Sequence, residues 1–232
     1  MIITKTPYRI SFFGGGSDYP SWYKKFGGSV LSTTIDKYIY TSCRELPPFF
    51  DHKYRIVWSK IENVKKVNEI KHLTVRKLIK YNKIKPGLEI HYDGDLPARS
   101  GMGSSSSFSV GLMRALNYYQ HRDIKGINLA YKTIIFEQKI MKETVGSQDQ
   151  VAASVGGFNK INFLKNNKIL IKKIVNNNLK RLNSNLLLLY TGIQRNAETI
   201  ANNYVHKLSN EKEKNIRKII SNVELGEKMI KS

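Results

Sequence analysis

The chain has 232 residues, of which 41% are hydrophobic and 25% charged, as expected for one large folded domain or two small ones. Its single cysteine, Cys43, excludes an intrachain disulfide and a cysteine zinc cluster, which fits a reducing cytoplasm. The sequence starts without an apolar signal core, and its longest apolar run, residues 186–189, is far too short for a bilayer span. We therefore expect a cytoplasmic protein without a membrane partner.

The chain is strongly basic, with 39 Lys and Arg against 18 Asp and Glu and a formal net charge of +21. Such a charge suits nucleic acid, anionic lipid or phosphorylated small molecules. However, Lys, Asn and Ile are abundant in nearly every segment, as in residues 166–168, whereas a nucleic-acid footprint gathers on one face. We interpret the charge as a composition bias and expect no nucleic-acid partner. A basic nucleic-acid-binding protein is an alternative that rests on the charge alone.

Periodicity and turn residues predict the elements that come first in the chain. Residues 1–6 and 7–13 have the pattern of two strands, the second ending at the triple glycine 14–16. That triple glycine predicts either a tight turn or a close approach of the backbone to a neighbour. Further strands are expected over 35–44 and 54–60, with a loop at 47–48 and a basic helix over Leu73–Tyr81.

The stretch 95–107, DLPARSGMGSSSS, carries the strongest functional signal. Residues 88–92 before it alternate as in a strand, and apolar residues recur at helical spacing over 108–119 after it. Gly101 and Gly103 therefore lie at a strand-to-helix junction. Permissive glycines beside the free N–H groups of a helix start favour phosphate binding.

Four consecutive serines, residues 104–107, open this predicted helix. Their hydroxyls could cap the helix, contact phosphate oxygens or ligate a hard cation such as magnesium. A flexible Ser/Gly linker is the alternative, but the long amphipathic helix that follows disfavours it. The stretch is not a P-loop, which needs Lys after its last glycine, nor a dinucleotide fingerprint, which needs a third glycine where Ser106 stands.

Two carboxylates further on are candidate functional groups. Glu137 interrupts an apolar stripe of the helix predicted over residues 128–142, so it must be paired, metal-bound or protonated. An ion pair at the edge of the stripe is the alternative reading. Asp149 lies in a turn before a short helix of small residues at 151–154, where it is either a helix cap or a functional group.

Residues 121–128, HRDIKGIN, match the catalytic loop of protein kinases. We reject the match because no Asp-Phe-Gly follows, no Val-Ala-Ile-Lys strand precedes, and the segment lies between two helical patterns. Gly126 is instead expected to help end one helix, and Asn128 to cap the next.

Beyond residue 157 the pattern predicts a hairpin, a buried strand and two helices. The hairpin strands are expected over 159–163 and 168–175, the buried strand over 186–190, and the helices from near residue 196 and over 211–232. A turn at 191–195 places Arg195 near the start of the first helix.

Three segments resemble the GHMP small-molecule kinases, the family of galacto-, homoserine, mevalonate and phosphomevalonate kinases. The first family motif is matched by Pro7, Arg9, Gly14, Asp18 and Tyr19. The second is matched by Pro97 and by residues 100–106, SGMGSSS. In the third, Asp149 stands where the family has its catalytic Asp, after a Gly-x-x turn and before a Gly-Gly pair, with Glu137 upstream at the position of the magnesium carboxylate.

The resemblance implies an α+β protein in two parts. Residues 1–160 would form a two-layer N-terminal ATP-binding and catalytic domain, similar to ribosomal protein S5. Residues 161–232 would form an incomplete C-terminal domain of partial ferredoxin-like fold. Family members continue for roughly another hundred residues, typical of half a domain, and carry a Gly-x-Gly-Gly-Gly motif that this sequence lacks. Apolar surface exposed by a missing half-domain is expected to favour a homodimer or aggregation.

The resemblance also implies ATP and Mg²⁺ as ligands and phosphoryl transfer to a sugar hydroxyl as the reaction. Asp149 would take the hydroxyl proton or orient the hydroxyl, and Arg9 would stabilise the developing charge. Ser105 and Glu137 would hold magnesium. The implied ATP-binding residues are Pro97, Ser100, Gly101, Met102, Gly103, Ser104, Ser105 and Ser106. The implied substrate-binding residues are Arg9, Gly15, Gly16, Ser17, Asp18, Asp149 and Arg195.

The first motif carries a hint of the substrate, because Gly15 and Gly16 stand where galactokinases have Glu-His. The segment GGGSDYP is similar to that of heptose 7-phosphate kinases and of the kinase part of fucokinases, and a roomier pocket suits a seven-carbon sugar phosphate. The expected acceptor is the anomeric hydroxyl of D-glycero-D-manno-heptose 7-phosphate. The alternatives are a fucokinase or galactokinase, or a truncated protein that binds nucleotide or sugar phosphate without turnover.

Overall fold

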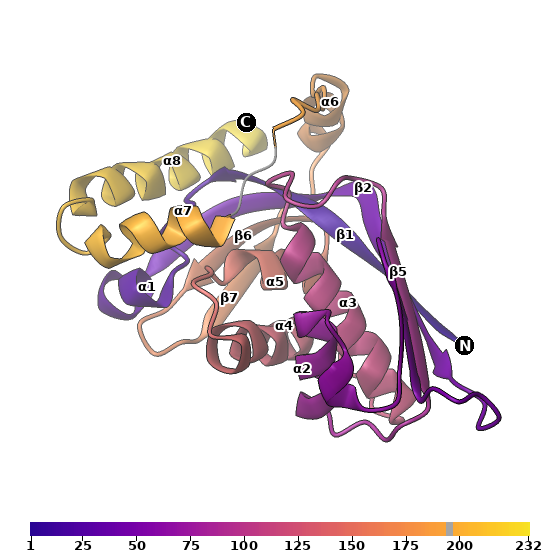
Figure 1. Ribbon diagram of the computed structural model, residues 1–232. Helices are drawn as coiled ribbons and strands as arrows, with labels where there is room; N and C mark the ends of the chain where they lie inside the picture. Colours follow the sequence, from indigo (N-terminus) through magenta and orange to yellow (C-terminus); the bar gives the residue numbers. More distant parts are fainter. Residues whose placement is uncertain (194–196) are drawn as a thin grey trace.

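The computed structural model describes residues 1–193 and 197–232, which form a seven-stranded sheet with helices on both faces (Figure 1). The strand order is β4-β3-β5-β2-β6-β7, and β1 also pairs with β2. Among these pairs only β3 and β5 run parallel. The strands are β1 (Ile2–Phe13), β2 (Gly28–Glu45), β3 (Tyr54–Val57), β4 (Ile61–Val64), β5 (Leu88–Gly94), β6 (Phe158–Phe163) and β7 (Ile169–Lys173).

Helices α2 to α5 cover one face of this sheet, and α8 packs against part of the other (Figure 1). This arrangement confirms the α+β architecture, with α8 adding a third layer over part of the sheet. No helix among the described residues is both long and apolar enough to cross a membrane. The helices are α1 (Pro20–Phe26), α2 (Leu73–Tyr81), α3 (Ser104–Tyr119), α4 (Gly126–Ile135), α5 (Gln148–Val155), α6 (Asn178–Ser184), α7 (Ala197–Tyr204) and α8 (Glu213–Lys231).

Strand β2 organises the sheet because its 18 residues pair with three other strands. Val30 and Leu31 are both completely buried although neighbouring residues of a strand point to opposite faces. Val30 belongs to a core with Val151 of α5, whereas Leu31 packs with Val223 of α8. The sheet is therefore covered on both sides at this end, next to the triple glycine that follows β1.

The structure corrects the prediction of two strands at the start of the chain. Residues 2–13 form a single strand, β1, whose register with β2 shifts between Pro7 and Arg9 and again between Ser11 and Phe13. Proline lacks an N–H but fits an extended strand next to an irregularity, so the strand continues through Pro7, which lies opposite Tyr38, and the register shifts at Tyr8. The shift changes which residues lie opposite β2 just before Arg9, whose backbone stays in the sheet while its side chain reaches Asp149.

The central helices are confirmed in place and corrected in detail. Helix α2 has the predicted bounds, and α3 begins at Ser104 as expected. The helix predicted over 128–142 instead begins at Gly126, so Asn128 lies inside it, and it changes to a π-helical segment at Phe136–Met141. Glu137 lies in this π-helical segment, a type of irregularity that is frequent at functional sites.

The predicted hairpin is confirmed as β6 and β7, with Asn167 at a φ of 65° in the turn. The predicted boundary at residue 160 falls inside β6, and the division into two domains stays a prediction. Residues 186–190 were expected to form a buried strand, but they are an exposed connection in which Leu187 is 81% exposed. An apolar run without periodicity does not specify its partner, and no strand of the described chain pairs with it.

Candidate active site

A cleft of about 1370 Å³ lies where the end of β1, the loop before α3 and the start of α5 meet. Its lining includes residues from all three motif segments, which the fold brings together from distant parts of the sequence. The predicted site residues that line it are Arg9, Gly15, Gly16, Asp18, Pro97, Gly101, Gly103, Ser104, Ser105, Ser106 and Asp149.

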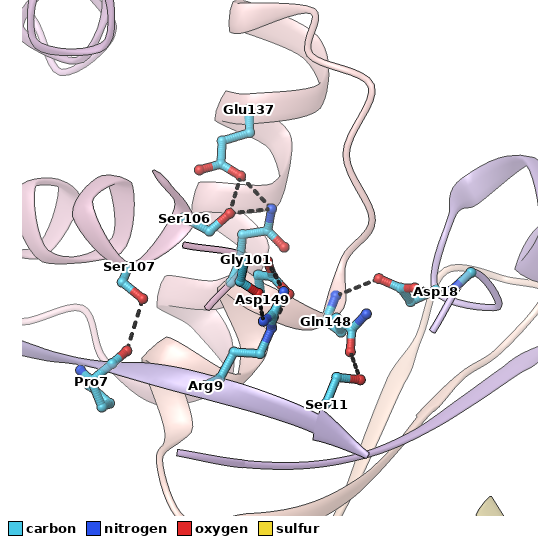
Figure 2. A network of polar contacts seen from close by, with 12 residues as sticks. Pro7, Arg9, Ser11, Asp18, Gly101, Ser106, Ser107, Glu137, Gln148 and Asp149 are labelled. Atoms are coloured by element: carbon cyan, nitrogen blue, oxygen red, sulfur yellow. Dashed lines mark hydrogen bonds and ion pairs between the residues drawn. The ribbon is translucent and has the colours of Figure 1, made fainter. Parts of the chain in front are cut away.

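Arg9 and Asp149 form the central ion pair of this cleft (Figure 2). Arg9 Nε donates to Asp149 Oδ1 and Arg9 NH2 donates to Asp149 Oδ2, both at 2.7 Å. Arg9 NH1 also donates to the Gly101 carbonyl at 2.8 Å, and the backbone N–H of Arg9 donates to the Met102 carbonyl at 3.1 Å. Burial lowers the pKa of Arg9, but the charge and hydrogen bonds of Asp149 raise it overall. One guanidinium therefore connects the first, second and third motif segments.

The glycine-rich loop turns tightly against this pair before α3 begins. Gly103, the residue before the helix, has a φ of 75°, and a Cβ there would lie 3.3 Å from both Arg9 Cγ and Asp149 Oδ2. No side chain caps the start of α3, so its first N–H groups are available to a ligand. Asp149 lies in the first turn of α5, where a negative charge is favoured by the helix dipole. The starts of two helices thus meet at the cleft, an arrangement suited to anions.

Asp18 is 1% exposed and holds the triple-glycine turn against the start of α5. Its Oδ1 accepts from the Gly16 N–H and its Oδ2 from the Gln148 N–H, both at 3.1 Å. A Cβ at Gly146 would lie 1.9 Å from Asp18 Oδ2, so only glycine fits there. Burial raises the pKa of Asp18 to about 6, and the charge of Asp149 adds to the rise. Both Asp18 oxygens accept from backbone N–H groups, so Asp18 stabilises the conformation of the triple-glycine turn.

Glu137 lies behind the cleft, 1% exposed, in contact with residues that line it (Figure 2). Its Oε2 accepts from Ser106 Oγ at 2.9 Å and from Gln150 Nε2, while its Oε1 is buried without a hydrogen-bond partner among the described residues. Burial raises the pKa of Glu137, against hydrogen bonds from Gln150 and the serines of α3 that lower it. Ser105, the other predicted magnesium ligand, is exposed in the lining.

The remaining predicted site residues that the structure describes lie outside the lining. Ser17 is completely buried and bonds to the Gly14 and Ser29 carbonyls at 2.7 and 3.0 Å, so it fixes the turn. Met102 packs against the core beside α3. The Ser100 hydroxyl is buried without a partner in the described part of the chain, and Arg195 lies outside the described residues.

Sequence reasoning missed several residues that the fold brings to the site. Gln148 accepts at its Oε1 from Ser11 Oγ at 2.7 Å, and Gln150 bridges Ser106 and Glu137. Both flank Asp149, which is the one signal that could have identified them. Tyr204 of α7 lines the cleft opposite Tyr19, with ring centroids 6.1 Å apart, and no local motif marks this pair.

One end of the cleft is aromatic. Trp58, His72, Tyr92 and Phe108 all line it, and the Tyr92 and Phe108 ring centroids are 4.4 Å apart. Burial lowers the pKa of His72, which favours a neutral ring at neutral pH. The cleft therefore has an aromatic end and a polar end around Arg9 and Asp149.

Comparison with known proteins gives the class to which this site belongs. The profile described as GHMP kinases N terminal domain matches residues 66–157. A D-glycero-alpha-D-manno-heptose 7-phosphate kinase from Campylobacter jejuni subsp. jejuni serotype O:2 is 30% identical over 223 residues, which cover 91% of this chain and 66% of that protein. The chain therefore contains a GHMP kinase N-terminal domain.

Solved structures agree with this fold. A D-glycero-D-manno-heptose 1-phosphate kinase from Bacteriodes thetaiotaomicron superposes with a TM-score of 0.69 at 24% identity, over 77% of this chain and 61% of that one. A mevalonate kinase superposes with a TM-score of 0.65 at 17% identity, over 98% of this chain and 73% of that one. The chain thus spans just under two thirds of the length of its heptose kinase relatives, 66% of one and 61% of the other.

Proposed function

We propose that this chain is an ATP-dependent sugar kinase that phosphorylates the anomeric hydroxyl of D-glycero-D-manno-heptose 7-phosphate. The observation that carries the proposal is the Arg9–Asp149 ion pair, which lies in the cleft against Gly101 and Gly103 of the glycine-rich loop. Phosphoryl transfer depends on donors around the phosphates, a cation near the developing charge and a group that positions the attacking hydroxyl. This pair and loop would supply all three within one cleft.

In this proposal the N–H groups of the loop and of the first turn of α3 bind the phosphates, with Ser104 to Ser106 adding hydroxyls. Asp149 orients the acceptor hydroxyl or takes its proton, and Arg9 stabilises the charge that develops as the phosphoryl group moves. Because Arg9 also donates to Gly101, the same side chain sets the distance between the phosphate loop and Asp149. Positioning of this kind accounts for much of the catalysis in phosphoryl transfer.

The residues present fit a magnesium ion. Glu137 Oε1 is a buried carboxylate oxygen without a hydrogen-bond partner in the described part of the chain, and serine hydroxyls adjoin it. No cluster of three or more His, Cys, Asp or Glu that could hold a metal occurs among the described residues. Magnesium usually takes one or two protein carboxylates together with substrate phosphates and water. Ser105 and Glu137, with Ser106 beside them, would hold the ion, which would neutralise charge on the phosphates.

The identity of the sugar is proposed from the relative and from the shape of the first motif. The Campylobacter jejuni protein is named a heptose 7-phosphate kinase, and its match extends over 91% of this chain. Gly15 and Gly16 line the cleft without side chains, and a Cβ at Gly15 would meet only Gln148 Nε2, at 3.9 Å. This leaves space for a sugar larger than galactose next to Asp149.

The test is a magnesium-dependent ADP-release assay on this chain with ATP and a panel of sugars. We expect turnover with heptose 7-phosphate to exceed turnover with galactose and fucose. Higher turnover with galactose or fucose would contradict the heptose assignment and leave the sugar kinase standing. If no sugar of the panel gives turnover, the proposed kinase activity itself is contradicted.

One observation favours a second candidate, a protein that binds nucleotide or sugar phosphate without turnover. Each oxygen of Asp149 accepts one bond from Arg9, so only the remaining lone pairs are left for a hydroxyl while the pair stays closed. ATP binding measured by calorimetry, with no ADP release in the presence of any sugar, would favour this candidate.

A further inference from the structure

Glu62 is a carboxylate in edge strand β4 that is only 7% exposed. Charged residues are rarely buried unless donors surround them, because an unpaired charge loses its hydration on burial. Glu62 has three such donors. Its oxygens accept from the Trp58 indole N–H at 3.0 Å, from the His72 backbone N–H at 3.1 Å and from the Lys71 backbone N–H.

These bonds join two separate segments of the chain. Trp58 lies in the turn of the β3–β4 hairpin, whereas Lys71 and His72 directly precede α2. The His72 ring centroid is 4.9 Å from that of Trp58 and 5.3 Å from that of Phe108. Glu62 therefore fixes the hairpin turn against the start of α2, and with it the relative placement of two aromatic rings.

Trp58 and His72 form one wall at the aromatic end of the cleft, and Tyr92 and Phe108 continue it. The rings of Trp58 and His72 are at 73° to one another, so a planar ligand that stacks on one ring meets the other edge-on. Such surfaces bind planar heterocycles by stacking, a contact that depends on ring orientation. Glu62 itself does not line the cleft, so it would act on a ligand only through the rings that it holds.

We propose that Glu62 is a positioning residue that holds Trp58 and His72 as a stacking wall for the base of the nucleotide. The proposal rests on the proposed kinase function, since it assumes that the phosphates of the same nucleotide bind at the glycine-rich loop. The bond to the indole N–H fixes the orientation of the Trp58 ring, and the bonds to the backbone fix the start of α2. Loss of the carboxylate would weaken base binding while leaving the phosphate end of the cleft intact.

The test is Glu62→Gln, which keeps the shape of the side chain but presents an NH₂ group to donors that need an acceptor. We expect the KM for ATP to rise about tenfold, the scale of one lost stacking contact, with kcat nearly unchanged. Inhibition by inorganic tripolyphosphate, which has phosphates and no base, should be the same in variant and wild type. Acrylamide quenching should also reach Trp58 more readily, because the other tryptophan, Trp22, is completely buried.

The matched control is Glu69→Gln. The Glu69 carboxylate accepts from the Lys65 and Lys66 N–H groups in the same connection, and none of these three residues lines the cleft, so the KM for ATP should not change. If Glu62→Gln does not fold, Trp58→Phe removes the indole donor alone and should still raise the KM for ATP.

The outcomes separate the two proposals. An unchanged KM for ATP in Glu62→Gln, or in Trp58→Phe if only that variant folds, would overturn the role of Glu62 and leave the kinase standing. If Glu62→Gln weakened ATP binding and tripolyphosphate inhibition equally, the role of Glu62 would also be overturned, because the defect would then extend to the phosphate loop. Wild-type protein that binds tripolyphosphate but not ATP would overturn both.

Discussion

Both carboxylate oxygens of Asp149 accept hydrogen bonds from the Arg9 guanidinium at 2.7 Å, although the two residues are 140 positions apart in the chain. The profile of the family domain begins at residue 66, so it contains Asp149 but not Arg9. The pair closes only when β1 lies beside the start of α5, and the Gly101 carbonyl takes a further guanidinium bond. A shift in any of these three segments would therefore disturb the other two.

Replacing Asp149 by Asn keeps the shape of the side chain but removes its charge. We expect kcat in the ADP-release assay to fall about a hundredfold or more, the scale of a lost general base or positioned carboxylate. ATP affinity measured by calorimetry should be largely kept, because the phosphates bind to the loop. Unchanged turnover would remove Asp149 from the mechanism.

Gly103→Ala and Gly101→Ala form a matched pair. Both glycines have positive φ, 75° and 79°, so each alanine should cost about 1–2 kcal/mol of backbone strain. Only the alanine at 103 brings a methyl group to 3.3 Å from both Arg9 and Asp149, whereas nothing lies within 4 Å at 101. We expect similar losses of thermal stability and a clearly larger loss of turnover for Gly103→Ala. Equal losses of turnover would show that the contact with the ion pair is unimportant.

The stability of the protein should depend on the ionisation of Asp18. Burial raises its folded-state pKa to about 6, above its ordinary value of 3.8, so between about pH 4 and pH 6 the folded state holds a proton that the unfolded state has released. The free energy of unfolding should therefore fall as pH rises through this range, and Asp18→Asn should lack this part of the fall. Urea unfolding of both proteins from pH 4 to pH 7 measures the difference. If the difference in free energy of unfolding between wild type and Asp18→Asn does not change with pH, the raised pKa of Asp18 is contradicted.

Glu137→Gln should separate stability from function. Burial raises the pKa of the Glu137 carboxyl group, so replacing this group by a neutral amide should leave the melting temperature unchanged or higher. The Mg²⁺ concentration needed for half-maximal activity should rise, because a carboxylate ligand is lost. Ser105→Ala should likewise weaken the magnesium-dependent affinity for ATP. Ser107→Ala is the control, since its hydroxyl bonds to the Pro7 carbonyl and not to Glu137. Equal magnesium dependence in all four proteins would rule out a metal site at Glu137.

The exposed leucines after α6 should reduce solubility. Leu187 and Leu189 are 81% and 73% exposed, and adjacent apolar side chains of this kind promote self-association. The double variant Leu187→Asp, Leu189→Asp should stay monomeric to higher concentration in sedimentation experiments. Lys165→Glu, at another exposed position, lowers the net charge by the same amount and should not have this effect. Identical behaviour of the two variants would assign any change to charge alone.

Local signals were sufficient for the elements whose residues interact with near neighbours in the sequence. Helix α2 follows from its 3.6-residue periodicity, and the β6–β7 hairpin from alternation around Asn167. The same signals failed for residues 186–190, where an apolar run predicted burial but the fold provides no partner strand. They also divided β1 at Pro7, because a proline at a register shift resembles a break in the strand.

The sequence by itself determined the glycine-rich loop at a strand-to-helix junction and the candidate carboxylates, because each depends on residue types within one short segment. The α+β class followed from the resemblance of three such segments to the GHMP kinases. Only the tertiary structure decided that Arg9 pairs with Asp149, that Asp18 holds the start of α5, and that Glu137 meets Ser106 while Ser105 faces the cleft. It also brought Tyr204 and the wall held by Glu62 to the same cleft. These contacts depend on how strands and helices pack across long sequence separations, and such packing leaves no local pattern.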